Sequence, residues 1–363
     1  MRMNLKFVAL AALVVASASA PAARTGMTAA VGPKFTSIGP LAFGPNGVLL
    51  AGDPLAGTLF AVDLGNQSSG GVQGTQDVPG IDQKVAALLG TDAAQITVTD
   101  LAVHPTTHNS YLSVMRGQGP SAQAALVRVD GAGKLTVVAL DSLSFTSVAL
   151  PNPANVSTSP RGGRAESITD LGFANGRVFV AGLSNEEFAS KLWSVPYPFA
   201  AADRGASVEI FHGNHGRVET QSPVYTFLPY TIDNQPYLIG AYLCTPLVKF
   251  PLAALKAGDK VRGTTIAELG QGNRPIDMVL YKKDGKEFLL MSNTSRGVMK
   301  IPTTNFASLA PITEKVTTET SGIAYETIAS MTGIEQLDLL DATHSIVIAK
   351  AGSAKNLQAV ILP

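Results

Sequence analysis

Two stretches of the chain, residues 226–251 and residues 277–302, share one pattern without a gap. They read TFLPYTIDNQPYLIGAYLCTPLVKFP and DMVLYKKDGKEFLLMSNTSRGVMKIP. Apolar runs align with apolar runs, and a polar turn aligns with a polar turn. A repeat of this length, made of short apolar strands separated by turns, is typical of propeller blades. The sequence therefore predicts an all-β fold, a β-propeller.

The same unit can be followed through the rest of the chain. Further units open with apolar runs at residues 38–43, 96–103, 168–173 and 332–338. The last unit has three strands where a complete blade has four. We predict six blades, closed by an N-terminal strand near residues 27–31 that completes the last blade. Seven blades are the alternative, if residues 141–165 or 303–330 contain another sheet.

The chain divides into three parts. Residues 1–20 have the pattern of a signal peptide, with Arg2 and Lys6 before an apolar run and Ala18-Ser19-Ala20 at its end. Residues 21–34 are an N-terminal segment with the closing strand, and residues 35–363 form a single propeller domain. A helical insertion is expected near residues 81–90, where apolar side chains recur at helical spacing. We predict an exported protein, periplasmic or extracellular, without membrane insertion after cleavage.

Composition narrows the classes of partner. Only 15% of the residues are charged and the formal net charge is zero, which disfavours binding to nucleic acid. Cys244 is the single cysteine, so no disulfide can form within the chain. Because it ends an apolar run, we interpret Cys244 as a small buried hydrophobe. We expect a monomer.

Candidate ligand or metal residues lie where the innermost strands begin and the second strands end, which is one face of a propeller. Aligning the repeats places Asp100, Asp170, Thr226 and Asp277 at one position around the channel. Amide side chains fall beside them, and a further acid lies near the same position of the last blade. The candidates are Asp100, Asp170, Asn185, Asp277, Asn293 and Glu335. Carboxylate and amide oxygens suit Ca²⁺.

Loops on the same face carry further charged side chains that could bind a ligand. These candidates are Arg116, Arg164, Glu186, Glu187, Arg274 and Arg296. Arginine suits a carboxylate or phosphate group. In the alternative interpretation, the acids bond backbone amides or pair with these arginines and have a structural role. His212 and His215 could contribute to a zinc site, but the sequence shows no third ligand.

With these features the chain resembles the secreted six-bladed β-propeller superfamily, which includes calcium-dependent lactonases and gluconolactonases. The resemblance implies a central cation held by residues such as Asp100, Asp170 and Asp277. We expect an exported propeller that binds a small polar molecule or a protein partner on this face without catalysis. The alternative is a Ca²⁺-dependent hydrolase or lactonase with its site at the channel, so the sequence leaves open whether the protein is an enzyme.

Overall fold

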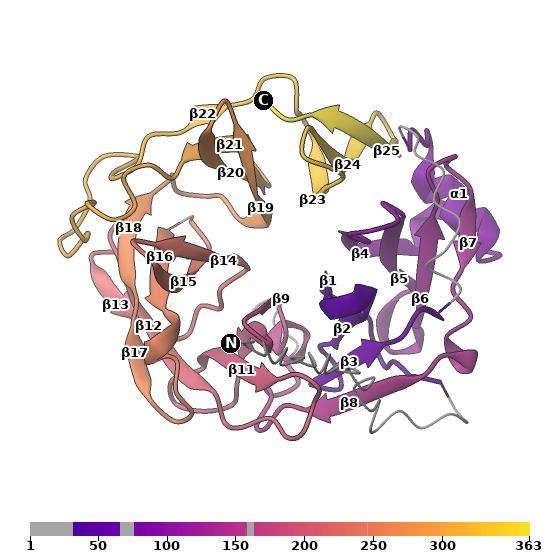
Figure 1. The fold of residues 1–363 in the computed structure, drawn as a ribbon, viewed down its shortest axis with the longest axis horizontal. Helices are drawn as coiled ribbons and strands as arrows, with labels where there is room; N and C mark the ends of the chain where they lie inside the picture. The colour runs from indigo at the N-terminus through magenta and orange to yellow at the C-terminus, as the bar shows by residue number, and fades with distance from the viewer. Residues whose placement is uncertain (1–31, 66–75, 158–162, 245) are drawn as a thin grey trace, which may run out of the picture.

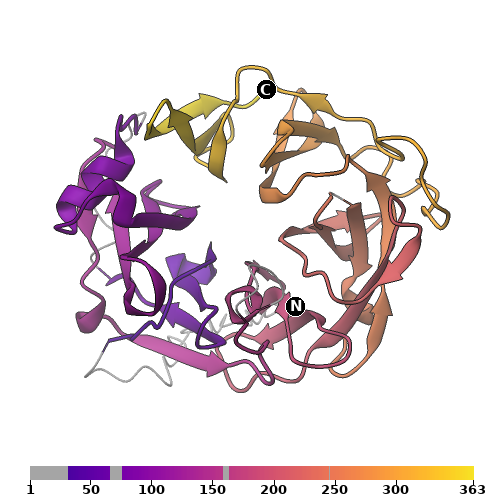
Figure 2. The same cartoon turned by 180° about the vertical axis from the view of Figure 1, so that it is seen from behind.

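The computed structural model describes residues 32–65, 76–157, 163–244 and 246–363. Six antiparallel sheets surround a central axis, which makes the molecule a six-bladed β-propeller (Figure 1; Figure 2). The predicted fold class and blade number are thus confirmed. The predicted signal peptide and the predicted closing strand near residues 27–31 lie outside the described residues.

We number the blades in chain order and give their strands from the axis outward. Blade one contains β1 (Leu41–Phe43), β2 (Leu49–Asp53), β3 (Thr58–Val62) and β8 (Phe145–Ala149). Blade two contains β4 (Ile96–Val103), β5 (Ser110–Arg116), β6 (Gln123–Val129) and β7 (Leu135–Val137). Blade three contains β9 (Asp170–Ala174), β10 (Arg177–Leu183), β11 (Ser190–Pro196), β12 (Ala206–His212) and β13 (Arg217–Glu219), with β17 (Lys260–Arg262) parallel to β12.

The remaining blades follow the same plan. Blade four contains β14 (Thr226–Ile232), β15 (Gln235–Ala241), β16 (Pro246–Pro251) and β18 (Thr264–Glu268). Blade five contains β19 (Pro275–Lys283), β20 (Lys286–Asn293), β21 (Gly297–Pro302) and β22 (Glu326–Thr327). Blade six contains β23 (Ile334–Leu339), β24 (His344–Ala351) and β25 (Ala354–Ile361). The single α-helix of the described residues is α1 (Ile81–Leu88), where the sequence pattern predicts a helix.

Two regions that could have formed a seventh blade supply outer strands instead. Strand β8 lies within residues 141–165 and pairs with β3 of blade one. Strand β22 lies within residues 303–330 and pairs with β21 of blade five. Each region therefore completes an existing sheet, which leaves six blades.

Tight hairpins join the two innermost strands of several blades. In blade three, Asn175 and Gly176 have φ angles of 51° and 71°, so both central residues of the turn lie in the left-handed region. Asp284 and Gly285 do the same in blade five, with φ angles of 50° and 74°. Asn, Asp and Gly adopt this conformation most readily, and the twist of such turns matches that of the strands. These short turns fix the register of the paired strands that line the axis.

The blades do not follow one another around the ring in chain order. After blade two the chain returns to blade one to add β8, and it then starts blade three on the other side of blade one (Figure 1). The innermost strands contact one another in the order β4, β1, β9, β14, β19, β23 and back to β4. Each of the six largest apolar clusters fills one junction of this ring, for example blades one and two or blades two and six. Blade six therefore meets blade two, and not blade one.

Helix α1 and the segment before it cover the junction where the ring closes. Helix α1 contacts β25 of blade six and β4 and β7 of blade two. Ahead of the helix, Val78 forms a two-bond bridge with Leu357 on the outer edge of β25, with N···O distances of 2.8 and 3.1 Å. This bridge protects part of the outer edge of blade six, to which the described residues contribute three strands. In the described residues no helix is long and apolar enough to cross a membrane.

Candidate functional site

Three aspartates face the central channel from alternate blades. Asp100 lies on β4, Asp170 begins β9 and Asp277 lies on β19. In the ring order given above, these strands belong to every second blade. The matching positions of the intervening blades, judged by the backbone groups that the aspartates bond, hold Pro40, Thr226 and Gln336. The alignment of the repeats places the three aspartates at one position, and the structure brings them around one axis.

Each aspartate bonds its own strand and a neighbouring blade. One oxygen of Asp170 accepts the N–H of Leu171 at 2.7 Å, and the other accepts the N–H of Phe227 in blade four at 2.6 Å. Asp100 bonds Leu41 of blade one in the same way, at 2.6 Å. Asp277 bonds Leu337 of blade six, at 3.0 Å. One interpretation of the sequence is that these acids bond backbone amides, and the hydrogen bonds agree with it. They also join two blades, whereas a cap would bond one strand only.

A fourth carboxylate, Asp338, joins the ring at its closure. Its oxygens accept the N–H groups of Leu339 in its own strand and of Val103 in blade two, both at 2.7 Å. Asp338 lies two residues beyond Gln336, so its side chain faces the same side of the strand. The repeat alignment missed it because it lies outside the aligned position. The period of two along a strand would have indicated it.

Burial raises the pKa of all four carboxyl groups. Each is half-buried, because its oxygens face a narrow channel. The pKa of Asp170 is raised to about 7 and that of Asp338 to about 6, in both cases by burial and against the lowering effect of their hydrogen bonds. Burial likewise raises the pKa of Asp100 and Asp277 well above 3.8, and the charges of the neighbouring aspartates raise it further. Among the described residues no Lys or Arg forms an ion pair with these four acids.

A cavity of about 400 Å³ opens where the innermost strands begin, and we call it the channel mouth. The three aspartates form its floor, and the first residues of β4, the residue before β9 and the loop after β20 contribute hydroxyl groups. Its lining residues are Pro40, Thr97, Val98, Thr99, Asp100, Thr169, Asp170, Tyr225, Arg274, Ile276, Asp277, Thr294 and Gln336. This is the face on which the sequence predicts a site.

Arg274 is the cationic side chain of the channel mouth. It is exposed, and its guanidinium carbon lies 4.3 Å from the centre of the Tyr225 ring, a cation–π contact. The hydroxyl of Tyr225 donates to Glu166 at 2.8 Å, and this hydrogen bond holds the tyrosine ring in place. The arginine is therefore held at the rim of the cavity with its donors available to a ligand.

A second cavity, of about 290 Å³, lies on the other side of the aspartates. It shares Asp100, Asp170 and Asp277 with the channel mouth, and Asp338 lines it as well. Its remaining walls are mostly apolar residues of the innermost strands. The three shared aspartates thus lie in the channel between the two cavities.

Three of the six predicted ligand or metal residues lie away from the channel lining. Asn185 is exposed in the loop after β10, and its N–H donates to the carbonyl of Asn152. The amide of Asn293 is buried and bonds Asn273 at 2.9 Å and the carbonyl of Met291 at 3.1 Å. Glu335 is skipped by a bulge in the pairing of β23, and it forms ion pairs with Lys350 and Lys355.

Three of the six other predicted charged residues have hydrogen-bond or ion-pair partners within the protein. Arg116 bonds the carbonyl of Gly90 beyond α1, and Arg296 pairs with Glu319 at 2.5 Å. Glu186 pairs with Lys191 at 2.8 Å, which contributes to lowering its pKa. Two more lie outside the channel lining: Arg164, the first residue of a short 3-10 helix, packs beside Gly57, and Glu187 is exposed in a loop. Of this second group of candidates, Arg274 reaches the channel mouth.

The donor set that the resemblance implies for Ca²⁺ is therefore not assembled. Ca²⁺ takes about six to eight oxygen ligands. The channel offers four carboxylates, each of which already accepts backbone N–H groups, while Asn185, Asn293 and Glu335 lie elsewhere. In the described residues, the acids of the channel form no group of three whose oxygens could share one ion. We derive no chemistry through Ca²⁺.

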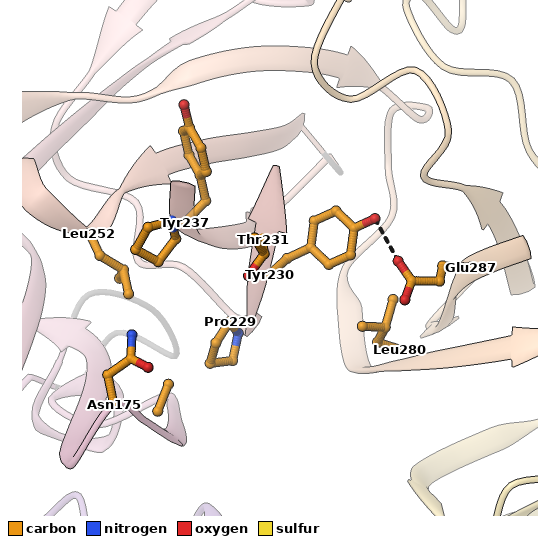
Figure 3. A pocket seen from close by; sticks show the side chains of 10 residues that line it. Asn175, Pro229, Tyr230, Thr231, Tyr237, Leu252, Leu280 and Glu287 are labelled. Carbon is orange, nitrogen blue, oxygen red and sulfur yellow. Dashed lines mark hydrogen bonds between the residues drawn. The ribbon is translucent and has the colours of Figure 1, made fainter. Parts of the chain in front are cut away.

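A further cavity, of about 270 Å³, lies on the opposite face between the hairpins of blades three, four and five (Figure 3). In Figure 3, Tyr230 points toward Glu287, and its hydroxyl donates to that carboxylate at 2.9 Å. Pro229, Leu252 and Leu280 supply apolar walls. Its single acid is already bonded, so this cavity lacks the group of carboxylates found at the channel.

The class of protein that fold and site define is a six-bladed β-propeller with an acidic channel. No family model matches the chain, and no curated protein matches it. Similar solved structures include a glucose dehydrogenase, at 12% identity over 93% of this chain and 100% of that chain, with a TM-score of 0.37. The soluble aldose sugar dehydrogenase of Escherichia coli matches at 13% identity over the same shares, with a TM-score of 0.33.

Another similar structure is of a different kind of protein. Extracellular domains 1–2 of Drosophila Semaphorin 1b match at 11% identity over 93% of this chain and 88% of that chain, with a TM-score of 0.35. Similarities at this distance transfer neither activity nor ligand, since a propeller fold hosts many functions.

Proposed function

We propose that this protein is a ligand-binding β-propeller that holds a small polar molecule at the channel mouth without catalysis. The observation that carries the proposal is the convergence of Asp100, Asp170 and Asp277 on one cavity of about 400 Å³ that Arg274 also lines. A cavity of this size falls within the range of about 300–1,000 Å³ that holds small ligands. The ring of blades keeps these groups in place before a ligand arrives, which lowers the cost of binding.

The charges define the chemistry of the ligand. The carboxylates raise one another's pKa and have no cationic partner among the described residues, so a ligand ammonium or hydroxyl group would stabilise them by donating hydrogen bonds. Arg274 would receive a carboxylate, phosphate or other acceptor of the same molecule. A small molecule that combines donors at one end with an acceptor at the other meets both requirements, as amino acids and sugar acids do.

One observation favours a second candidate function, a hydrolase or lactonase at the same place. The pKa of Asp170 is raised to about 7, a value that suits a general acid or base near neutral pH. Both oxygens of Asp170 accept backbone N–H groups, however, and this restrains the carboxylate from moving a proton to a substrate. Binding without catalysis is therefore the function we prefer.

The test is a panel of amino acids, amines, polyols, sugar acids, lactones and Ca²⁺, screened by thermal unfolding and followed by calorimetry. A ligand at 100 times its Kd should stabilise the protein by about 2.7 kcal/mol. We expect Arg274→Ala and Asp277→Asn each to weaken binding at least tenfold. Arg262→Ala, which removes an exposed arginine of β17 paired with Glu209, is the matched control and should leave binding unchanged.

Two results would contradict the proposal: a panel in which nothing binds, or binding that survives both substitutions at the channel mouth. Consumption of a lactone that stops in Asp170→Asn would instead support the hydrolase. A stabilisation by Ca²⁺ that exceeds that of Na⁺ at equal ionic strength would support a calcium site.

A further inference from the structure

A second group of chemically reactive side chains lies away from the channel, on blades three and four. His212 ends β12, His215 follows in the turn before β13, and Cys244 lies in the turn after β15. One ligand atom from each of the three lies within 4.8 Å of the other two. The sequence alone shows the two histidines but no third ligand, because Cys244 is distant in the chain and arrives only through the packing of neighbouring blades.

Glu219 of β13 orients both histidines. One of its oxygens lies 2.9 Å from Nδ1 of His212, and the other lies 2.6 Å from Nδ1 of His215. A carboxylate facing Nδ1 holds the proton there, so that Nε2 keeps its lone pair. A metal-binding histidine commonly has a carboxylate at its other nitrogen, which fixes the tautomer and the ring orientation. One glutamate here provides this arrangement for two rings at once.

The Nε2 atom of His212 is an independent sign of a missing ligand. The His212 side chain is only 3% exposed, and in the described structure its Nε2 has no hydrogen-bond partner. The nearest acid is Glu268, whose Oε2 is 3.8 Å away and accepts from the amide of Asn214 at 3.1 Å. A buried polar atom left without a partner costs about 1–3 kcal/mol. A metal ion bound to this nitrogen would remove that cost.

We infer that His212, His215 and Cys244 bind one Zn²⁺ ion, with Glu219 as the positioning residue. Imidazole nitrogen and thiolate sulfur are the ligands that zinc prefers, whereas Ca²⁺ and Mg²⁺ prefer oxygen. Three protein ligands leave the fourth tetrahedral position to water or to a ligand, as in sites where zinc is reactive.

The surroundings of the site leave room for a ligand at the fourth coordination position of the ion. A cavity of about 490 Å³ lies alongside, and its walls include Glu219 and Leu243, the residue before Cys244. The side chain of His215 is 43% exposed, so an ion can reach the site from solvent. Tyr225 lines both this cavity and the channel mouth. The zinc site itself is independent of the function proposed for the channel.

The competing account needs no metal: a protonated His212 between Glu219 and Glu268 would form a buried ion-paired group. The two accounts differ in the role of Cys244, since its thiol has no part in the ion pair. They differ also in stoichiometry. Metal binding should be one ion per chain and should stabilise the folded protein, because the unfolded chain lacks the assembled site.

The experiment uses the full chain, free of affinity tags and treated with a chelator. Zn²⁺ is titrated against a coloured competing chelator, and Co²⁺ is then substituted so that thiolate-to-cobalt absorption reports Cys244 directly. We expect one Zn²⁺ per chain, a higher unfolding midpoint with Zn²⁺, and the cobalt–thiolate band. Cys244→Ser should abolish that band, and His215→Ala should abolish stoichiometric binding. Because His215 is partly exposed, its variant should fold even if Cys244→Ser does not.

Two further variants complete the design. Glu219→Gln should weaken Zn²⁺ binding about 10- to 100-fold while the cobalt–thiolate band persists at saturating metal, which a purely structural role would not produce. His344→Ala is the matched control, since His344 is a partly exposed histidine beside an acid, Asp341, on blade six. Zn²⁺ binding below one ion per chain, or unchanged binding in both Cys244→Ser and His215→Ala, would overturn the inference.

Discussion

At the scale of single residues, Asp170 combines two opposing effects. Its carboxylate accepts N–H groups from two blades, which favours the ionised form, while burial favours the neutral form. Burial prevails and raises the pKa to about 7. The folded protein therefore holds a proton that the unfolded chain would release, and protonation of Asp170 stabilises the fold. This contribution is complete below the ordinary pKa of 3.8 and is lost as the pH rises through about 7.

We predict that Asp170→Asn changes how stability depends on pH. Asn keeps the shape without the charge, but its NH₂ group faces a backbone N–H, which costs about 1–3 kcal/mol at every pH. The wild type alone loses stability as Asp170 ionises. The unfolding midpoint of the variant should therefore rise relative to the wild type between pH 5 and pH 8, measured by thermal unfolding at constant ionic strength.

Comparing variant with wild type cancels groups that do not interact with Asp170, such as Glu268, whose pKa is also raised to about 7. The charge of Asp170 also raises the pKa of Asp100 and Asp277, so its removal lowers their pKa and adds to the expected rise in the same direction. Asp341→Asn is the control, because the pKa of Asp341 is lowered to about 2 and the group stays ionised throughout. If the difference between Asp170→Asn and the wild type is the same at pH 5 and pH 8, the pKa of Asp170 is not raised.

At the scale of elements, a buried acid fixes the first described segment to its blade. Asp53 ends β2 and is fully buried. It accepts hydrogen bonds from the N–H of Thr36 at 2.6 Å, from the N–H of Ser37 at 3.0 Å and from the N–H of Ala56 at 3.0 Å. One carboxylate thus accepts backbone N–H groups both from the chain before β1 and from the turn that leads to β3. Its role is comparable to that of the channel aspartates, within one blade.

We predict that Asp53→Ala destabilises the protein by about 3 kcal/mol or more, since each buried N–H left without an acceptor costs about 1–3 kcal/mol. Urea unfolding at pH 7 measures the change. Asp92→Ala is the control: Asp92 is exposed and its side chain bonds nothing at the start of its short 3-10 helix, so the effect should stay within about 0.5 kcal/mol. Equal midpoints for the two variants would contradict this account of Asp53.

Strands, hairpins and the position of the channel aspartates follow from local pattern and could be predicted. Asp277 and Thr226 align because the hairpin turn, residues 284–285 in one repeat and 233–234 in the other, follows at the same spacing. The alignment fails at blade six, where it predicts Glu335 near the channel. A bulge at Glu335 shifts the register of β23, so Gln336 and Asp338 line the channel instead. The contact between Cys244 and the two histidines depends on how two blades pack. Such contacts between distant parts of the chain leave no periodic signal in the sequence.

At the scale of the whole molecule, the ring depends on its junctions. Aspartates bond across four of them in the described structure, namely β4 to β1, β9 to β14, β19 to β23 and β23 to β4. At the other two, Pro40 and Thr226 occupy the matching positions, and apolar packing joins the blades. The order of blades around the ring could not be predicted, because β8 returns to blade one only after blade two is complete. That return places blade two against blade six, where the ring closes.

Because α1 covers the junction between blades two and six, we predict that it stabilises the whole ring and not blade two alone. Ile81 is fully buried in the apolar cluster that α1 shares with blades two and six, so Ile81→Ala should destabilise the protein by about 2–5 kcal/mol. Leu88→Ala, in the same helix but 40% exposed, is the control and should change stability far less. Hydrogen exchange should then show faster exchange in Ile81→Ala for amides of both β4 and β25, because losing α1 uncovers both sides of the junction. Faster exchange confined to blade two would mean that the helix supports one blade, and that the ring is closed by Asp338 and the innermost strands without it.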